Sequence, residues 1–245
     1  MRLAVISDIH ANLVALEAVL DDIAERAPDA IVNLGDCVSG PLWPRETMEL
    51  LTARGIPSVR GNHDRFLAER PEARLGAPDR FALAQLGADW VRHLHGLPTT
   101  IDISDEVLAV HGTPSDDNTY LLEDTDSGRM APAPRAAVIA RLAGAMDRQV
   151  VLCGHSHRQS VVQIPGGPLV LNPGTVGCPV SAENSLAREL EFRSPHARYA
   201  ILTRRAGRWR AELHALDYDW DRAAAQAEAA GGAGWREALS VGTVG

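Results

Sequence analysis

The stretch "RLAVISDIHANLVALEAVLDDIAERAPDAIVNLGD", residues 2–36, decides how the chain folds. Residues 2–7 form an apolar run with β-branched side chains, and 29–34 form a second, so both segments are predicted to be buried strands. Between them, residues 12–26 place leucine and isoleucine side chains on one helical face, with Asn12 as the N-cap. A strand–helix–strand unit of this length indicates parallel strands joined by a right-handed crossover.

The alternation continues through one more unit and then stops. Residues 44–55 predict a helix with a proline near its start and a glycine at its end, and 57–62 predict a third strand. Residues 65–100 break the rhythm with a polar, proline-containing stretch and a helix predicted at 79–96. We expect this segment to be a helical cap insertion that packs over the sheet edge or the active face.

The second half of the chain is mostly strands joined by hairpin turns. An acidic loop (115–134) and a helix (134–146) interrupt it, and from about residue 219 an Ala-rich helix leads into a Gly-rich end. Parallel units followed by hairpins predict an α/β fold of two stacked mixed sheets flanked by helices, in a single domain over residues 1–245. The strands expected in this half are 99–103, 106–110, 149–153, 160–164, 168–172, 198–204 and 208–216.

The bulk composition narrows the class of protein. A formal net charge of −8 over 245 residues argues against a general nucleic-acid or anionic-membrane binder, which would carry a basic surface. Three widely spaced cysteines do not suggest a disulfide framework. The N-terminal apolar run is too short for a secretory signal, and no run approaches the roughly 18 apolar residues that span a membrane. We therefore expect a soluble, cytoplasmic protein, and the sequence leaves its oligomeric state open.

Polar side chains suited to metal binding follow the ends of the predicted strands. His155 and His157 stand at alternate positions, so in an extended segment both imidazoles project to the same side. Parallel sheets bind ligands beyond the carboxyl ends of their strands, so the clusters are expected to meet on one rim. Together they predict a metal site assembled from several loops. The metal-competent residues in these clusters are Asp8, His10, Asp36, Asn62, His63, Asp64, His111, His155 and His157.

The ordered set "DxH…GD…GNHD…H…GHxH" resembles the signature of the calcineurin-like metallophosphoesterases over about residues 3–177. The short insertion and simple second half are most similar to the small bacterial and archaeal phosphodiesterase branch. The resemblance implies a four-layer sandwich that binds two divalent ions, with Asp36 bridging them. It further implies that Asp8, His10 and His157 hold the first ion, and that Asn62, His111 and His155 hold the second.

The resemblance also implies a reaction: hydrolysis of a small or nucleotide-like phosphodiester by a hydroxide that the ion pair generates from water. We assign His63 to protonation of the leaving group, because it follows the ligand Asn62 and imidazole has a suitable pKa. Asp64 either orients that ring or caps a following turn. The mixed nitrogen and oxygen ligands suit Mn, Fe, Zn, Ni or Co, with Mn weakly favoured.

Several alternatives remain open at this stage. The chain could instead be a dinucleoside polyphosphate hydrolase, a nucleotide phosphatase, or a non-catalytic interaction scaffold like the retromer subunit of this superfamily. A protein phosphatase is disfavoured, because "GDCVSGP" carries Ser39 and Gly40 where those enzymes carry an Asp-Arg pair. Arg60 and Arg158 flank the motifs and are candidates for phosphate contact. Trp43, Trp90 and Tyr120 could stack on a nucleobase, although packing is the commoner role.

Overall fold

A computed structural model describes residues 1–125, 130–178 and 194–242. The first sheet has the strand order β11-β10-β1-β2, in which β1 (Arg2–Ile6) pairs in parallel with β2 (Ala30–Asn33). β10 (Ala197–Arg205) runs antiparallel to β1 and to β11 (Arg208–Leu216). The parallel pair is the one that residues 2–36 predict, with α1 (Leu13–Arg26) as its crossover.

The second sheet has the order β3-β4-β7-β9-β8. Its three central strands are parallel, and the two edge strands β3 and β8 run antiparallel to them. A small two-stranded sheet of β5 and β6 lies in the region predicted as an acidic loop. The bounds are β3 (Thr100–Ser104), β4 (Val107–Val110), β5 (Glu123–Asp124), β6 (Ala131–Pro132), β7 (Val150–Leu152), β8 (Gln159–Gln163) and β9 (Leu169–Pro173).

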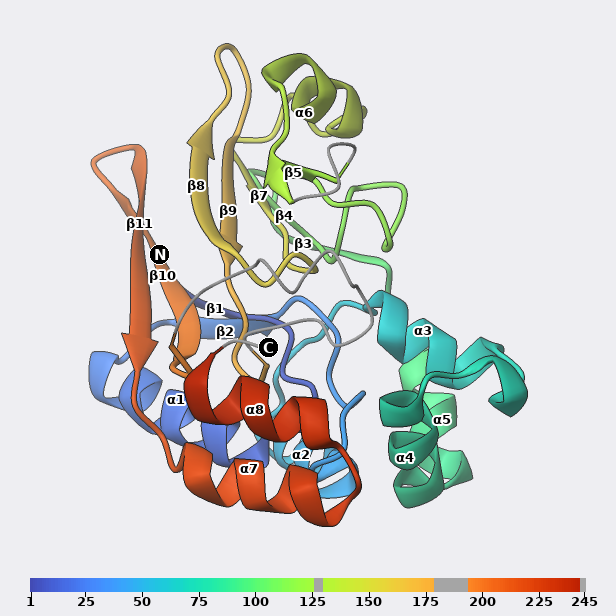
Figure 1. Ribbon diagram of the computed structural model, residues 1–245. Helices are drawn as coiled ribbons and strands as arrows, with labels where there is room; N and C mark the ends of the chain where they lie inside the picture. The colour runs from blue at the N-terminus through green and yellow to red at the C-terminus, as the bar shows by residue number, and fades with distance from the viewer. Residues whose placement is uncertain (126–129, 179–193, 243–245) are drawn as a thin grey trace.

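Alternate side chains of the strands build the layers. Leu3 and Val5 of β1 pack in one apolar cluster with Leu152 and other residues of the second sheet, so the two sheets face each other. The intervening Ala4 packs on the opposite side in the cluster that contains α1, and Val151 packs in the cluster that contains α6 (Arg135–Arg141). The result is the predicted two-sheet α/β sandwich with helices outside both sheets (Figure 1).

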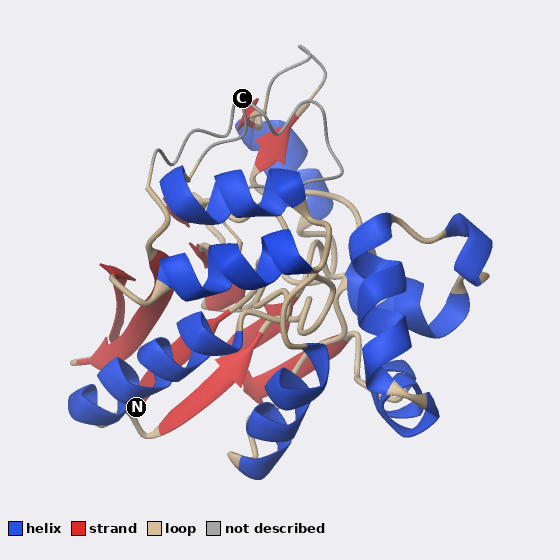
Figure 2. Cartoon of the chain, turned by 60° about the horizontal axis from the view of Figure 1, so that its bottom comes forward, coloured by secondary structure: helices blue, strands red, loops and turns tan. Residues whose placement is uncertain are grey.

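The remaining helices form two groups at one end of the sandwich (Figures 1 and 2). One contains α3 to α5 and the short 3₁₀ turn η1, and the other contains α7 and α8, next to α2 and α1. None of the described helices is long and apolar enough to cross a membrane. Their bounds are α2 (Pro44–Ala53), α3 (Asn62–Glu69), η1 (Glu72–Arg74), α4 (Ala77–Leu86), α5 (Ala88–His95), α7 (Trp220–Ala229) and α8 (Ala233–Val241).

Two sequence predictions in the first hundred residues are wrong. Residues 57–62 form only an isolated bridge between Asn33 and Ser58, and helix α3 already begins at Asn62. The helix predicted at 79–96 is instead two helices, because Gly87 adopts a left-handed φ of 77° between them. A short apolar run and a helical periodicity do not reveal where neighbouring elements interrupt them.

The C-terminus also differs from the predicted Gly-rich end. A turn around Gly231 and Gly232 joins α7 to a second helix, α8. Helix α8 runs antiparallel to α7 and packs against it. Trp235 and Leu239 of α8 are buried, and they pack with Ala11 and Leu42. The final residues, 243–245, lie outside the described part of the chain.

Candidate metal centre

The loops that follow four strands meet at the end of the sandwich beside these helices. Asp8 and His10 follow β1, Asp36 follows β2, His111 follows β4, and the segment carrying two histidines follows β7. Backbone bonds tie these loops together across the two sheets, as Asp8 N donates to Gly35 O (3.0 Å) and Gly154 N to His111 O (2.7 Å). Six of the seven predicted ligands therefore follow strands of the two sheets, and the seventh, Asn62, begins helix α3 at the same rim, where its Oδ1 lies 3.0 Å from His111 Nε2.

The backbone at this rim is strained. Eight non-glycine residues in the described chain have a positive φ, and five of them are predicted ligands. Left-handed conformations cost non-glycine residues free energy and cluster at functional sites, where the surrounding structure enforces them. The five are Asp8 (54°), His10 (49°), Asp36 (54°), His155 (65°) and His157 (59°).

Asp8, His10 and His157 form a first ligand group, and their ligand atoms lie within 4.8 Å of one another. His10 Nδ1 donates to Ser39 O (2.8 Å) and His157 Nδ1 to Cys178 O (2.9 Å). Because a carbonyl only accepts, both Nδ1 atoms carry a hydrogen, so the neutral form of each ring has its lone pair on Nε2. These lone-pair nitrogens are 3.1 Å apart, an arrangement that a cation between them would stabilise.

A buried carboxylate oxygen completes this group. Asp8 Oδ1 finds no hydrogen-bond partner among the described residues, and it lies 3.4 Å from His157 Nε2. Leaving a carboxylate oxygen buried without a donor is costly, whereas coordination of a cation would satisfy it. The first group therefore fits a divalent ion.

Asp36, His111 and His155 form a second ligand group, whose atoms also lie within 4.8 Å of one another. His111 Nδ1 donates to Leu34 O (2.8 Å), so its Nε2 faces Asn62 Oδ1 (3.0 Å) and Asp36 Oδ2 (3.4 Å). Burial lowers the pKa of His111, but the Asp36 carboxylate outweighs it and raises the value to about 10. A bound cation would take the place of that proton.

The carboxylate of Asp36 faces both groups. Its Oδ2 atom lies 3.9 Å from His10 Nε2 and 3.4 Å from His111 Nε2, and its Oδ1 accepts the backbone N–H of His63 (2.9 Å). Burial raises the pKa of the Asp36 carboxyl, but the facing His111 and then His63 outweigh burial and hold this pKa well below its usual range. One carboxylate between two ligand groups is the geometry that a bridging role requires.

His155 is held by the loop that follows His111. Its Nε2 donates to Asn118 O (3.1 Å), which leaves Nδ1 as the lone-pair nitrogen, and Tyr120 stacks on the ring at a centroid distance of 4.5 Å. Burial, followed by the neighbouring His111, lowers the pKa of His155 to about 4. The ring is therefore neutral at physiological pH, as a metal ligand must be.

The Asp64 side chain forms hydrogen bonds with backbone amides. Its carboxylate accepts the amides of Gly61 (3.0 Å), Asp36 (2.9 Å) and Cys37 (2.9 Å), so it caps α3 and fixes the turn that carries Asp36. Burial, and then the charge of Asp36, raise the pKa of Asp64 to about 6. Of the two predicted roles, the structure shows the cap.

The ring of His63 instead meets an aspartate that the motifs do not mark. Asp79, in the first turn of α4, places Oδ1 at 3.0 Å from His63 Nδ1, and Ser39 Oγ lies 3.3 Å from the same nitrogen. The His63 ring also lies edge-on to His10, with centroids 5.6 Å apart. Nothing in the sequence points to Asp79, because it lies within residues 65–100, away from the strand-end clusters, and its packing against the rim is a tertiary feature.

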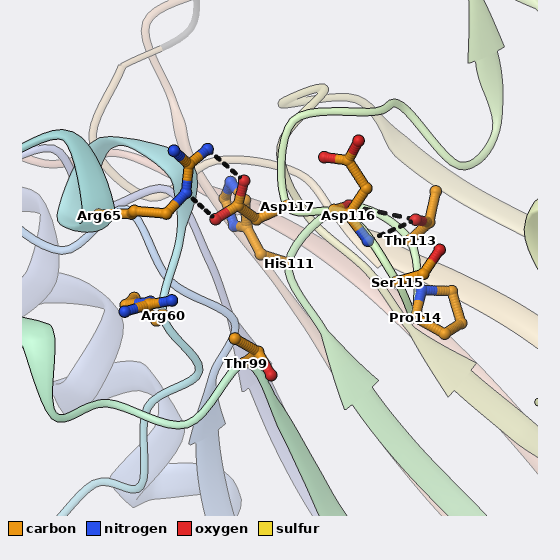
Figure 3. Close-up of a pocket in the computed structure, with 9 residues that line it drawn as sticks. All are labelled: Arg60, Arg65, Thr99, His111, Thr113, Pro114, Ser115, Asp116 and Asp117. Atoms are coloured by element: carbon orange, nitrogen blue, oxygen red, sulfur yellow. Dashed lines mark hydrogen bonds and ion pairs between the residues drawn. The ribbon is translucent and has the colours of Figure 1, made fainter. Parts of the chain in front are cut away.

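A cavity of about 330 Å³ opens beside the second group and is lined by charged side chains (Figure 3). Arg65 of α3 forms a bidentate pair with Asp117, with N–O distances of 2.7 and 2.6 Å. Arg60 also lines this cavity and donates to Glu69 Oε1 (3.2 Å). Arg158 donates to Met130 O (3.3 Å), so among the described residues it meets a carbonyl beside the small sheet.

The aromatic candidates mostly pack against protein. Trp43 lies beneath the Arg222 guanidinium at 5.3 Å, and Trp90 packs edge-on with His93. The first ligand group is bordered by an aromatic residue that the sequence did not single out, Trp235 of α8, whose ring lies edge-on to His10 at 6.0 Å.

Comparison with known proteins agrees with this geometry. Residues 1–191 match the model of the calcineurin-like phosphoesterase superfamily domain. The crystal structure of a metallophosphoesterase from Sphaerobacter thermophilus is 30% identical in sequence, with a TM-score of 0.75 over 99% of both chains. A hypothetical protein, PH1004, from Pyrococcus horikoshii has the same fold, with a TM-score of 0.81 at 18% identity over 100% of this chain and 99% of that one.

A curated relative matches over a short segment. An uncharacterized protein, MJ0912, from Methanocaldococcus jannaschii is 52% identical over 62 residues, which are 25% of this chain. The match spans about a quarter (26%) of that protein's length. The match to the family model, the shared fold and the two groups of potential metal ligands confirm the resemblance seen in the sequence. The chain belongs to the calcineurin-like phosphoesterase superfamily.

Proposed function

We propose that the protein is a phosphodiesterase that uses two divalent metal ions to hydrolyse a small or nucleotide-like phosphodiester. The observation that carries this proposal is the pair of ligand groups, in which the Nδ1 atoms of buried imidazoles are fixed by backbone carbonyls so that their Nε2 atoms face the neighbouring ligands. Asp36 faces both groups with one oxygen. A buried arrangement of unpaired acceptors has a cost that bound cations would remove.

In this proposal Asp8, His10 and His157 hold one ion, Asn62, His111 and His155 hold the other, and Asp36 contacts both. When bound, a divalent pair supplies a nucleophile from water near neutral pH and neutralises charge on the phosphate. Nitrogen and oxygen ligands of this kind suit Mn, Fe, Zn, Ni or Co.

His63 would donate the proton to the departing alkoxide. The ring lies at the rim beside His10, and Asp79 accepts from its Nδ1 across 3.0 Å. A carboxylate in this position fixes the tautomer and orientation of an imidazole and stabilises its protonated form, as in other His–Asp pairs. Asp79 is therefore assigned as the residue that positions the acid, and Asp64 as the residue that holds the Asp36 turn.

The charges around the rim favour a small substrate. The two arginines that line the cavity beside His111 are balanced by Asp116 and Asp117, so the cavity has no excess of basic groups, and the chain as a whole carries a net charge of −8. Both features oppose a long polyanion such as DNA, whose binding depends on basic phosphate contacts. A compact ester with one phosphate at the two ligand groups avoids that repulsion.

The test is hydrolysis of bis-p-nitrophenyl phosphate by the purified protein, with metal content measured on the same sample. We expect two ions per chain and turnover that chelation removes and that added Mn²⁺ restores. Two bound ions with no turnover on any phosphodiester, phosphomonoester or dinucleoside polyphosphate would instead favour a scaffold. Preference for nucleotides or dinucleoside polyphosphates over diesters would favour those narrower enzyme classes.

A further inference from the structure

A second cavity, of about 520 Å³, lies between the two groups of helices at the end of the sandwich. One wall is the start of α4, from Gly76 to Pro78 and at Phe81, and the other is the turn from Ala230 to Trp235 that joins α7 to α8. Pro41 also lines it. None of the residues that line it is charged, whereas the cavity beside His111 is lined by two arginines and two aspartates. Its size and lining suit an apolar group of a small ligand.

Both walls of this apolar cleft belong to elements that support the candidate catalytic residues. On one side, Trp235 packs edge-on against His10, and a Cβ at Gly40 would lie 2.4 Å from His10 O and 3.2 Å from the indole ring. On the other side, Pro78 and Phe81 flank Asp79, whose carboxylate lies 3.0 Å from His63 Nδ1. The cleft therefore lies one side chain away from His10, through Trp235, and its other wall flanks the aspartate that contacts His63. It shares no lining residue with the charged cavity.

We infer that the apolar cleft binds the organic part of the leaving group, so that the preferred substrates are phosphodiesters of aromatic or similarly apolar alcohols. This inference rests on the proposed function. The bond from phosphorus to the oxygen of that alcohol breaks, the oxygen of water forms the new bond to phosphorus, and His63 supplies the proton that the departing oxygen receives. The phosphate remains at the ligand groups while the ring of the alcohol lies between Phe81 and Trp235.

The cleft can be filled with one substitution. Gly234 is the second residue of α8, its φ is not left-handed, and a Cβ built there has no atom within 4 Å. Gly234→Leu should therefore occupy the cleft while favouring the helix. Ala225→Leu adds a leucine to an exposed position of α7 and is the matched control. Phe81→Ala, which removes a half-buried wall of the cleft, provides an independent second variant.

The first measurement compares kcat/KM for methyl 2-naphthyl phosphate and methyl phenyl phosphate, whose leaving alcohols have similar acidity. We expect the unmodified protein to prefer the naphthyl ester by about tenfold, since a second buried ring adds apolar contact in the transition state. The preference should fall to near unity in Gly234→Leu, should shrink in Phe81→Ala, and should persist in Ala225→Leu. A preference that is absent, or that Gly234→Leu leaves intact, overturns the inference.

The second measurement is direct binding of 2-naphthol to the same three variants by calorimetry, which does not depend on turnover. We expect Gly234→Leu to weaken binding by at least about tenfold relative to Ala225→Leu. If no phosphoester is hydrolysed, the proposed function fails and the substrate inference fails with it, even where naphthol binds. If both esters are hydrolysed equally and naphthol binding is the same in every variant, only the cleft inference fails.

Discussion

The two ligand groups have different surroundings. The group of Asp8, His10 and His157 is enclosed, because Trp235 of α8 packs against His10 and backbone carbonyls fix both imidazoles. The group of Asp36, His111 and His155 is the open group, because it borders the charged cavity. Its His155 is held by a loop, through the carbonyl of Asn118. One half of the centre is therefore covered by a residue of helix α8, and the other half borders a cavity and depends on the loop that carries Asn118.

The groups also differ in the protons that they hold before an ion binds. Burial, and then the neighbouring His157, lower the pKa of His10 to about 4, so His10 is ready to coordinate at neutral pH. His111, with its pKa raised to about 10, must release a proton first. We therefore expect the enclosed group to bind its ion more tightly and with less dependence on pH.

The largest expected effect comes from Asp36, which faces both groups. Asp36→Asn keeps an oxygen to accept the His63 amide but removes the charge between the two ions. We expect activity to fall by at least about a thousandfold, since metal ions supply several kcal/mol of transition-state stabilisation. Steady-state kinetics with metal analysis measures this, and Asp21→Asn at an exposed position of α1 is the control. Full activity in Asp36→Asn would remove the basis for a shared centre.

The next effect separates the proton donor from the ligands. His63→Ala should retain both ions and lose about 100-fold in kcat on diesters with alkyl leaving groups, the usual contribution of a general acid. The loss should be much smaller on p-nitrophenyl esters, whose leaving group needs no proton. Asp79→Asn should show the same pattern more weakly. Unchanged turnover of alkyl diesters in His63→Ala would refute the assignment.

The pH dependence of metal binding tests whether the two ligand groups differ in the protons that they must release. Below pH 10 the ion at the open group must displace the His111 proton, so its affinity should rise by about tenfold per pH unit between pH 6 and pH 8. The affinity of the enclosed group should change less, since His10 carries no proton in that range. Calorimetric titration with Mn²⁺ in buffers of different ionisation enthalpy counts the released protons. Equal proton release in both binding steps would contradict the difference between the groups.

A smaller effect should come from the Arg65–Asp117 pair, which ties α3 to the loop that holds His155. Arg65→Met removes the bidentate contact. It should lower the affinity of the open group for its ion by about tenfold, because residues that support the ligands contribute to metal affinity. The ion at the enclosed group should be unaffected. Arg92→Met, at a side chain that is 73% exposed on α5, is the control. Equal weakening of both ions would show that the pair acts on the fold as a whole.

The sequence predicts the rim better than its surroundings. Asp8, Asp36 and His155 each follow a strand, and parallel strands bring their carboxyl ends together, so the meeting of these loops follows from topology. Asp79 and Trp235 lie on helices whose positions depend on tertiary packing, and neither belongs to a periodic or strand-end pattern. The alanines and glycines near the C-terminus concealed α8, because a Gly-Gly turn between two packed helices has the composition of a loose end.

The most direct test of the central claim is the anomalous scattering of crystals grown with Mn²⁺, combined with elemental analysis of the same protein. A two-ion centre requires two manganese peaks, one among Asp8, His10 and His157 and one among Asn62, His111 and His155, with Asp36 between them. Ligand side chains that point apart, with no metal peak between them after soaking, would contradict it.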